Sequence, residues 1–436
     1  PVAESGGEDS GARKGWCGTI ALYSGAVLLL LAAMAGVSAG SAALQLHIDG
    51  KCETSKARVC RLKLPHFTCD TPMFMPVGTC AAVKGMTTEE LEELDVHLVL
   101  ANTYHLALQP GTELVQELGG IHEFMQWPRA MLTDSGGFQM VSLLKLAEIT
   151  EEGVTFQSPA DGSQMLLTPE KSIQLQNEIG ADIIMALDDV VSSTTTGPRV
   201  EEAMDRTLRW IDRCIEAHKR PHDQSLFGIV QGGLDLELRE RCCDALVKRN
   251  LPGYAVGGLS GGEAKDEFWK VVLHCTKRLP DEKPRYCMGV GYPVDLLVCV
   301  ALGVDMFDCV YPARTARFGV ALSDCGNYQL KQNRFKNDLA PIEKDCKCTT
   351  CLNFSRAYLH LIAAKEQTGC RLITIHNIAY MMRLMRRARE AIREGTYPEF
   401  VRTYMARAHP KRDYPGWVTD ALNAVGITLL PKEGAE

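Results

Sequence analysis

Short apolar segments recur along most of the chain, and each of them ends at a glycine or a polar residue. Most are followed by a stretch whose apolar residues repeat at helical spacing, which is the pattern of alternating strand and helix units. Eight segments fit this description: residues 74–78, 98–102, 131–134, 183–188, 226–231, 254–259, 286–290 and 306–311. The pattern therefore predicts an α/β fold, a (β/α)8 TIM barrel.

Local signals mark where several of the predicted helices begin. Residues 87–90 read Thr-Thr-Glu-Glu, a capping box, and Pro169 and Pro198 stand where a first helical turn tolerates proline. An open, doubly wound sheet is the structural alternative to a closed barrel. The chain contains no G-x-G-x-x-G dinucleotide fingerprint that would strengthen this alternative.

Polar residues at the ends of the apolar segments are the first candidates for chemistry, because barrel enzymes place their sites at the carboxyl ends of the strands. Four residues qualify: Asp134, Asp188, Gln231 and Asp308. Two acidic groups at neighbouring strand ends, such as Asp134 and Asp308, can flank a glycosidic bond, one as nucleophile and one as proton donor and acceptor. The alternative for each aspartate alone is a cap on the following helix.

The first 43 residues differ from the rest of the chain. Arg13 and Lys14 precede an apolar stretch over residues 19–39, which looks like a signal peptide or a short membrane anchor. A misassigned or disordered extension is the alternative. We therefore expect residues 1–43 to stand outside the fold and residues 44–436 to form one barrel domain, with a zinc subdomain over residues 340–400.

Charge and cysteine content narrow the function classes. The 436 residues carry a formal net charge of -7, which would repel a polyanion, so any nucleic-acid role must rest on local basic patches. The 17 cysteines are an odd number without small-scaffold spacing, which favours a reducing compartment over a disulfide framework.

Three clustered cysteines are the exception to this scattered pattern. Cys346, Cys348 and Cys351 are followed by His376, at the end of a strand-like apolar run over residues 372–375. Three thiolates and one imidazole satisfy a tetrahedral zinc ion and leave no open position, so the spacing predicts a structural Zn2+ site. Free cysteines in a loop are the alternative. The choice of His376 rests partly on the family resemblance that follows.

Several segments closely resemble the tRNA-guanine transglycosylase family, and the resemblance extends over residues 71–429. The matching segments are residues 74–79, 102–106, 134–139, 231–233, 257–263, 288–291, 307–309 and 314–317, together with the zinc cluster and residues 376–377. By this resemblance the protein exchanges guanine for queuine at the wobble position of tRNAs with G-U-N anticodons. Asp308 would be the nucleophile that holds the tRNA covalently, and Asp134 the general acid and base.

The resemblance also implies how the base is recognised. Asp188 and Gln231 would face the hydrogen-bonding edge of the purine, and the Gly258 amide and the Leu259 carbonyl would complete the set. The target nucleotide would have to flip out of the anticodon stack to reach them.

Four further pocket residues come from the same resemblance. Phe138 and Met288 would sandwich the purine ring, although ordinary core packing is the alternative for both. Val190 and Gly261 stand where bacterial members, which take an aminomethyl precursor base, carry a cysteine and a bulkier valine. A smaller residue at Gly261 would enlarge the pocket for the cyclopentenediol arm of queuine.

Contacts to the tRNA are expected from local basic residues. The resemblance assigns Arg314 and Arg317 to the nucleotides that flank the target, and three more basic residues precede the zinc cluster: Lys331, Arg334 and Lys336. A long arginine-rich helix is expected over residues 377–399. Its arginines could line the tRNA, or they could form an ordinary solvated face.

Partners and location follow from the family alone. The resemblance implies a heterodimer with a non-catalytic paralogous subunit, with the zinc region at the interface. It also implies a cytoplasmic location, possibly peripheral at the mitochondrial outer membrane. Two alternatives compete with the catalytic interpretation: the non-catalytic subunit itself, acting as a binding scaffold, and a barrel metallohydrolase, which would need an open metal site at the strand ends.

Overall fold

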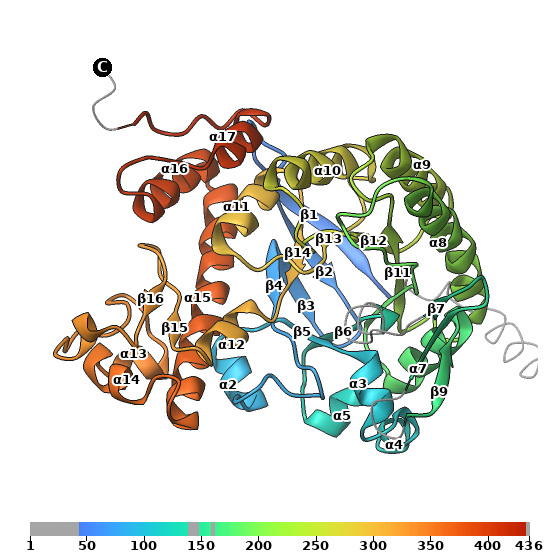
Figure 1. Ribbon diagram of the computed structural model, residues 1–436, viewed down its shortest axis with the longest axis horizontal. Helices are drawn as coiled ribbons and strands as arrows, with labels where there is room; N and C mark the ends of the chain where they lie inside the picture. The colour runs from blue at the N-terminus through green and yellow to red at the C-terminus, as the bar shows by residue number, and fades with distance from the viewer. Residues whose placement is uncertain (1–42, 138–147, 158–161, 433–436) are drawn as a thin grey trace, which may run out of the picture. The chain divides into compact units, whose positions relative to one another are not determined.

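The computed structural model describes residues 43–137, 148–157 and 162–432. Eight parallel strands lie at its centre in the order β4-β14-β13-β12-β11-β10-β6-β5 (Figure 1). Their bounds are β4 Met73–Met75, β5 Leu98–Ala101, β6 Ala130–Thr133, β10 Ile183–Met185, β11 Ser225–Val230, β12 Gly253–Val256, β13 Arg285–Cys287 and β14 Met306–Asp308. Each of the eight predicted segments contains or overlaps one of these strands.

The sheet closes on itself between its first and last strands. Val77, just after β4, pairs in parallel with Leu100 of β5, and the Gly78 amide donates to the Leu100 carbonyl at 2.7 Å. The barrel prediction is therefore confirmed, and the open-sheet alternative is wrong.

The strands are mostly apolar because both of their faces are covered. In β10, for example, Ile183 and Met185 belong to the cluster inside the barrel, whereas Ile184 packs into the cluster that includes residues of the surrounding helices. A strand buried on both sides reads as a continuous apolar run. This explains why short runs of three to six residues could be recognised in the sequence.

Helices surround the barrel (Figure 1). Thr87 forms the predicted capping box with Glu90, and Pro169 and Pro198 occupy the first turns of their helices, as predicted. Between the barrel strands lie α2 Thr88–Glu93, α3 Thr103–Leu108, α4 Thr112–Glu117, α5 Ile121–Met125, α7 Pro169–Ile179, α8 Pro198–Ala217, α9 Leu236–Lys248, α10 Lys265–Arg278 and α11 Pro293–Ala301.

Two small antiparallel sheets were not foreseen from the sequence. One precedes the barrel, with β1 Gln45–Lys51, β2 Arg58–Lys63 and β3 Thr68–Thr71, and the other follows β6, with β7 Glu148–Ile149, β8 Val154–Gln157 and β9 Gln164–Leu167. Leu62, Leu64 and Cys69 of the first sheet and its hairpin pack into the same cluster as the barrel interior. The first sheet therefore contributes to the core at the amino ends of the barrel strands.

The C-terminal part of the chain follows β14, the eighth barrel strand. It contains α12 Tyr311–Ala316, β15 Val320–Ala321, β16 Tyr328–Gln329, the 3-10 helix Asn333–Phe335, α13 Thr349–Asn353, α14 Arg356–Ile362, α15 Gln367–Arg393, α16 Tyr397–Ala408 and α17 Gly416–Asn423. Figure 1 shows the long α15 running beside the barrel.

The prediction of a strand before His376 is wrong. Residues 372–375 and His376 itself lie inside α15, which begins ten residues before the expected start at residue 377 and ends at Arg393. Residues 372–381 are all buried, so this part of the helix has no polar face and its sequence shows no helical period.

Residues 1–42, which make up nearly all of the N-terminal extension, lie outside the described residues, so the expectations for it stay predictions. Within the part of the chain that the structure describes, none of the helices has the length and apolar character needed to cross a membrane.

Candidate active site

Asp308 is the last residue of β14 and lies at the mouth of the barrel. Its Oδ1 accepts hydrogen bonds from the Tyr286 hydroxyl at 2.5 Å and from the Gly289 amide at 2.8 Å. Burial by surrounding protein atoms raises the pKa of the carboxyl, and the hydrogen bonds from Tyr286 and Gly289 oppose that shift. Both donors bond the same oxygen, so Oδ2 accepts no hydrogen bond from another residue that the structure describes.

Asp134 follows β6 and is held from two directions. Asn102, directly after β5, donates from its side-chain amide to Oδ2, and the Thr103 amide donates to Oδ1 at 3.0 Å. The Gly136 amide also donates to Oδ1, at 3.2 Å. These bonds fix a buried carboxylate at the start of the segment that resembles the transglycosylase motif.

The two carboxylates lie at the carboxyl ends of strands of one barrel, although the expectation that these strands are neighbours is wrong. β4 and β5 lie between β14 and β6 in the closed sheet. Asp308 and Asp134 both stand at the carboxyl ends of barrel strands, and the negative charge of each adds to burial in raising the pKa of Tyr286. A barrel brings the ends of distant strands to one opening, which makes this arrangement possible.

Asp188 and Gln231 form a second polar pair at the barrel mouth. Gln231 Nε2 donates to Asp188 Oδ2 at 2.6 Å. Burial raises the pKa of Asp188 to about 7; the Gln231 hydrogen bond opposes this shift, and the charges of Asp189 and Asp134 add to it. Gln231 Oε1 is buried without a hydrogen-bond partner among the described residues. The Gln231 side-chain carbonyl oxygen is therefore a buried acceptor without a donor, as expected in a site that binds a hydrogen-bonding ligand.

Gly258 must be glycine where it meets this pair. Its φ of +67° is in the left-handed region, and a Cβ at this position would collide with Gln231 Oε1. Leu259 is the next residue in the same loop, after β12, and Met288 follows β13. The ends of β10, β11, β12 and β13, four adjacent strands, thus bring the predicted base-recognition residues together. Phe138 lies outside the described residues.

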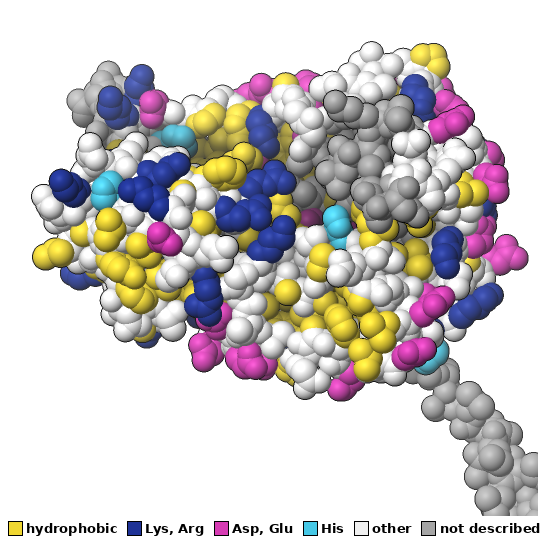
Figure 2. Space-filling view, turned by 60° about the horizontal axis from the view of Figure 1, so that its bottom comes forward, with side chains coloured by type: hydrophobic (Ala, Val, Ile, Leu, Met, Phe, Trp, Pro, Cys, Tyr) yellow, Lys and Arg dark blue, Asp and Glu magenta, His cyan; other side chains and the backbone are white. Residues whose placement is uncertain are grey.

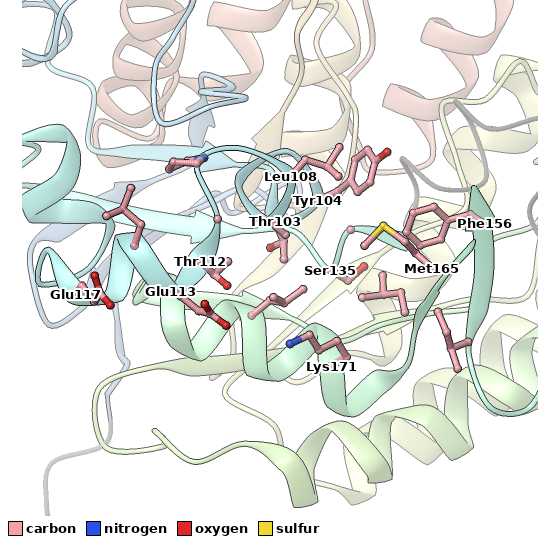
Figure 3. Close-up of a pocket in the computed structure, with 18 residues that line it drawn as sticks. Thr103, Tyr104, Leu108, Thr112, Glu113, Glu117, Ser135, Phe156, Met165 and Lys171 are labelled. Carbon is pink, nitrogen blue, oxygen red and sulfur yellow. The ribbon is translucent and has the colours of Figure 1, made fainter. Parts of the chain in front are cut away.

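A cavity lies beside these residues and not among them. It has a volume of about 550 Å³ and is bordered by α3, α4, α7 and the β8-β9 hairpin. Figure 3 shows Ser135, from the loop that carries Asp134, at its edge, with Tyr104, Phe156 and Met165 nearby. None of its lining residues belongs to the predicted base pocket, but Thr103 and Gly136, which donate hydrogen bonds to Asp134, line it, so the cavity adjoins the candidate site.

Tyr286, Asn102 and Gly289 are the residues of this site that sequence reasoning missed. Tyr286 opens the predicted segment 286–290, and Asn102 closes the segment 98–102, so both stood in recognised strands. Their side chains bond the two carboxylates across separate strands. Side-chain contacts between residues of different strands depend on how the strands are aligned in the barrel, and the local sequence does not show this alignment.

The predicted metal ligands lie together in the C-terminal part. The Sγ atoms of Cys346, Cys348 and Cys351 are 3.8, 3.8 and 3.3 Å from His376 Nδ1. In a tetrahedral site with ordinary Zn–S and Zn–N bonds this separation is about 3.6 Å. All four side chains are buried, and their ligand atoms lie within 4.8 Å of one another. The cluster therefore fits a zinc site.

The orientation of His376 supports this fit. Its Nε2 lies 2.8 Å from the Leu322 carbonyl, so Nε2 carries the proton and Nδ1 is left to face the sulfur atoms. Bonding of the distal ring nitrogen to a carbonyl is how proteins usually orient a metal-binding histidine. Because α15 holds His376 and the loop before α13 holds Cys346 and Cys348, the cluster joins segments that are distant in sequence.

The basic residues separate into two groups. Arg314 and Arg317 are exposed, and neither forms an ion pair with another described residue. The arginines of α15 are instead engaged within the protein: Arg383 pairs with Glu343, Arg387 with Asp324, and buried Arg389 donates to the Pro72 carbonyl. These three arginines therefore form ion pairs and hydrogen bonds within the protein, whereas Arg386 and Arg393 of the same helix are exposed.

A second histidine and carboxylate cluster lies at the opposite end of the barrel. His66, His122 and Asp182 place their polar atoms within 4.8 Å of one another, and Asp182 immediately precedes β10. This position is the amino end of the strand. The cluster thus does not supply the open metal site at the carboxyl ends that a barrel metallohydrolase would need.

The fold and the site define a class: a (β/α)8-barrel protein with buried carboxylates at the mouth of the barrel and a Cys3His cluster beside it. A family model described as queuine tRNA-ribosyltransferase matches residues 52–410. The chain belongs to this family.

Individual relatives agree with the family match. The queuine tRNA-ribosyltransferase catalytic subunit of Schizosaccharomyces pombe is 54% identical over 397 residues, which cover 89% of this chain and 98% of the relative. The catalytic subunit of Caenorhabditis briggsae is 51% identical over 388 residues, 86% and 97% of the two chains. The queuine tRNA-ribosyltransferase of Thermus thermophilus is 50% identical over 372 residues, 85% and 96% of the two chains. The eukaryotic names favour the catalytic over the non-catalytic interpretation.

Proposed function

We propose that the protein exchanges guanine for queuine at the wobble position of tRNAs with G-U-N anticodons, through a covalent enzyme–tRNA intermediate. The observation that carries this proposal is the placement of Asp308 and Asp134 at one barrel mouth, each held by hydrogen bonds, in a chain of the queuine tRNA-ribosyltransferase family. Two carboxylates across a sugar are the arrangement that a retaining displacement needs.

In the first step, Asp308 attacks the anomeric carbon of the ribose through Oδ2. A bond forms between this oxygen and C1′, while the bond from C1′ to the guanine nitrogen breaks. Tyr286 and the Gly289 amide keep the carboxylate fixed through Oδ1 and favour its charged form. Asp134 delivers a proton to the departing guanine, so that the base leaves without a full negative charge.

In the second step, the incoming queuine reverses this sequence. Asp134 takes the proton from the base nitrogen, the nitrogen attacks C1′, and the Asp308 carboxylate leaves. The same residue thus acts first as acid and then as base, as a symmetrical exchange requires. Because guanine departs before queuine reacts, the kinetics follow a ping-pong scheme.

Base selection in this proposal rests on Asp188, Gln231, Gly258, Leu259 and Met288. The uncompensated Gln231 Oε1 and the carboxylate of Asp188 are suited to N–H groups on the edge of a purine. Buried polar groups of this kind reject a base that leaves them unpaired. Val190 and Gly261 set the room for the substituent that distinguishes queuine from guanine.

The tRNA surface in this proposal begins at Arg314 and Arg317 in and just after α12, and continues through Lys331, Arg334 and Lys336. All five are exposed. Figure 2 shows basic side chains gathered over the side of the molecule where Figure 1 places the C-terminal part. A local patch of this kind can bind phosphates although the whole chain is acidic.

The Cys3His cluster holds one structural Zn2+ per subunit in this proposal. These four residues would hold the ion and so tie the loop before α13 to α15, and a site with four protein ligands would be structural and leave no position for substrate. Cys346, Cys348 and Cys351 would bind as thiolates, and His376 through Nδ1.

The same region is the proposed interface with a non-catalytic paralogous subunit. Large apolar side chains are exposed there, among them Leu352 at 68% and Leu361 at 63% on α13 and α14. Exposed apolar side chains that cluster in this way mark protein contacts. We further propose that residues 44–436 act as one barrel domain in the cytoplasm, with at most peripheral attachment at the mitochondrial outer membrane.

The proposed function is tested by exchange of radiolabelled guanine in tRNA for queuine, with the protein and its partner subunit together. Asp308→Ala should abolish label release and the covalent protein–tRNA adduct on a denaturing gel. Asp413→Ala removes an exposed aspartate remote from the site in sequence and should leave both intact. Unchanged release by Asp308→Ala would overturn the assignment of the nucleophile.

A further inference from the structure

An exposed tyrosine follows the strand that is paired with the strand of Asp308. Tyr292 lies between β13 and α11, and β13 pairs in parallel with β14, which ends at Asp308. The side chain of Tyr292 is 55% exposed. A single exposed aromatic residue is common on protein surfaces, so the case for a function depends on what surrounds it.

A second tyrosine holds the ring of Tyr292 in place. The rings of Tyr292 and Tyr311 have centroids 4.5 Å apart and planes inclined by 51°. Tyr311 is half-buried, and its hydroxyl accepts a hydrogen bond from Asn327 Nδ2 at 2.8 Å. Tyr292 therefore rests against a ring that is itself anchored, and a ligand that contacts it has little side-chain motion left to freeze.

The backbone before Tyr292 is packed against the loop of the proposed nucleophile. A Cβ at Gly291 would collide with Cys309 Cβ and lie 3.3 Å from Tyr311 Cβ. The φ of Gly291 is not in the left-handed region, so close approach and not conformation requires glycine here. Cys309 directly follows Asp308, and the Gly289 amide donates to Asp308 Oδ1 at 2.8 Å. The loops after β13 and β14 thus fix Tyr292 at a set position relative to the nucleophile.

Positive charge accompanies the aromatic pair. Arg314 lies three residues after Tyr311 in α12, so both side chains project from the same side of the helix. Arg314 is exposed and forms no ion pair with another described residue. An aromatic ring beside an unpaired arginine is the combination that binds single-stranded nucleic acid, because the ring stacks on a base and the guanidinium binds a phosphate.

We propose that Tyr292, supported by Tyr311, stacks on the unpaired base of a nucleotide next to the target guanine. The inference rests on the proposed function and deepens it, because it adds a base contact to the phosphate contacts of Arg314 and Arg317. The three residue steps from Asp308 to Tyr311 span at most about 11 Å, which keeps the platform close to the reacting nucleotide. A target base that flips out leaves its neighbours without their stacking partner, and the tyrosine ring replaces that partner.

The first test measures KM for an anticodon stem-loop RNA, with the full chain and its partner subunit. Tyr292→Ala should raise this KM by about 5- to 100-fold, the range that loss of one base–aromatic stack produces, and should leave KM for queuine at saturating RNA unchanged. Tyr292→Phe keeps the aromatic face and should behave like the wild-type protein, whereas Tyr292→Leu should not. Ile215→Ala is the control, because Ile215 is 40% exposed near the end of α8, at the amino end of the barrel.

A second test asks whether a base is the partner of Tyr292. Two further RNAs lack the base directly before or directly after the target guanine. If one of these bases stacks on Tyr292, Tyr292→Ala should cause no further rise in KM with the RNA that lacks it. An equal rise with the intact RNA and with both abasic RNAs would overturn the inference.

The remaining outcomes separate this inference from the proposed function. If the wild-type protein exchanges guanine for queuine and Tyr292→Ala uses the RNA equally well, the inference fails and the proposed function stands. If Tyr292→Ala instead weakens the association of the two subunits in sedimentation, and KM for the RNA is normal once they are fully assembled, this face is a protein interface and the inference fails. If the wild-type protein does not exchange the bases, the proposed function fails and the inference fails with it.

Discussion

Replacement of His66 by glutamine should remove a pH-dependent part of the stability at the amino end of the barrel. His66, in the hairpin between β2 and β3, places its Nδ1 2.8 Å from Asp182 Oδ1, and His122 of α5 places its Nε2 3.1 Å from Asp182 Oδ2. The amides of His66 and Met131 also donate to this carboxylate, at 3.1 and 2.8 Å. Asp182 thus connects the first small sheet, α5 and two barrel strands.

This cluster is better explained as a hydrogen-bonded clamp than as a metal site. The rings of His66 and His122 are stacked, with centroids 3.6 Å apart and planes inclined by 16°. An imidazole nitrogen binds a metal in the plane of its ring, and two stacked, nearly parallel rings cannot both do so at one ion. Each ring instead meets its own oxygen of Asp182.

The sign of the effect follows from the direction of the pKa shifts. The hydrogen bond to Asp182 raises the pKa of His66 above its usual 6.5; the charge of Asp223 adds to this, whereas burial and the charge of Arg220 oppose it. The stabilisation is therefore fully present below pH 6.5 and is lost as the pH rises through the pKa in the folded protein. His66 is 43% exposed in its side chain, so solvent screening limits the contribution to about 1 kcal/mol.

Hydrogen exchange of the His66 and Met131 amides measures this clamp directly, because both amides donate to Asp182. At pH 5.5 the opening free energy should be about 1 kcal/mol lower in His66→Gln than in the wild-type protein, and at pH 8.5 the two should nearly coincide. His222→Gln, which changes an exposed histidine, should show no such difference. An equal gap between wild type and His66→Gln at both pH values would refute the reasoning.

Three further predictions concern the proposed active site and the zinc cluster. Since the pKa of Asp188 is raised to about 7 and N–H groups of the base need its charged form, kcat/KM for queuine should fall as the pH drops below 7, and Asp188→Asn should remove this acid limb. Tyr286→Phe removes a hydrogen bond that lowers the pKa of Asp308, so the acid limb of kcat that Asp308 sets should move to higher pH and kcat should fall about 10-fold. Cys351→Ser should reduce bound zinc, measured by atomic absorption, and lower the melting temperature, whereas Cys80→Ser, at an exposed cysteine, should change neither.

The barrel could be predicted from the sequence because its strands are buried on both faces. Each strand contains a short apolar run that ends near a polar or glycine residue, and the order of the runs along the chain fixes the order of strand and helix units. The polar residues at the ends of these runs, Asp134, Asp188, Gln231 and Asp308, were found for the same reason. Each of these residues lies where a strand ends, and the end of an apolar run can be recognised from the local sequence.

Burial on every side of the middle of α15 also explains why the prediction of a strand before His376 failed. The run over residues 372–375 contains isoleucine and threonine and reads as a strand, yet it is the buried middle of α15, because a helix without a polar face loses its helical period. The pairing of Tyr286 with Asp308 likewise has no sequence pattern. It depends on which strands are adjacent in the closed sheet, and adjacency is a property of the whole fold.

The two ends of the barrel use the same type of residue in opposite ways. At the amino end, the oxygens of Asp182 accept hydrogen bonds from two amides and two imidazoles, and these partners lower its pKa in spite of burial. At the carboxyl end, Asp308 accepts bonds from other residues at one oxygen, Asp188 accepts one from Gln231, and burial raises the pKa of both. Asp182, with hydrogen bonds at both oxygens and a lowered pKa, is a fixed charge that stabilises the fold. Asp308 and Asp188 are buried with a raised pKa and can still gain a proton, a ligand or a covalent bond, as their proposed roles require.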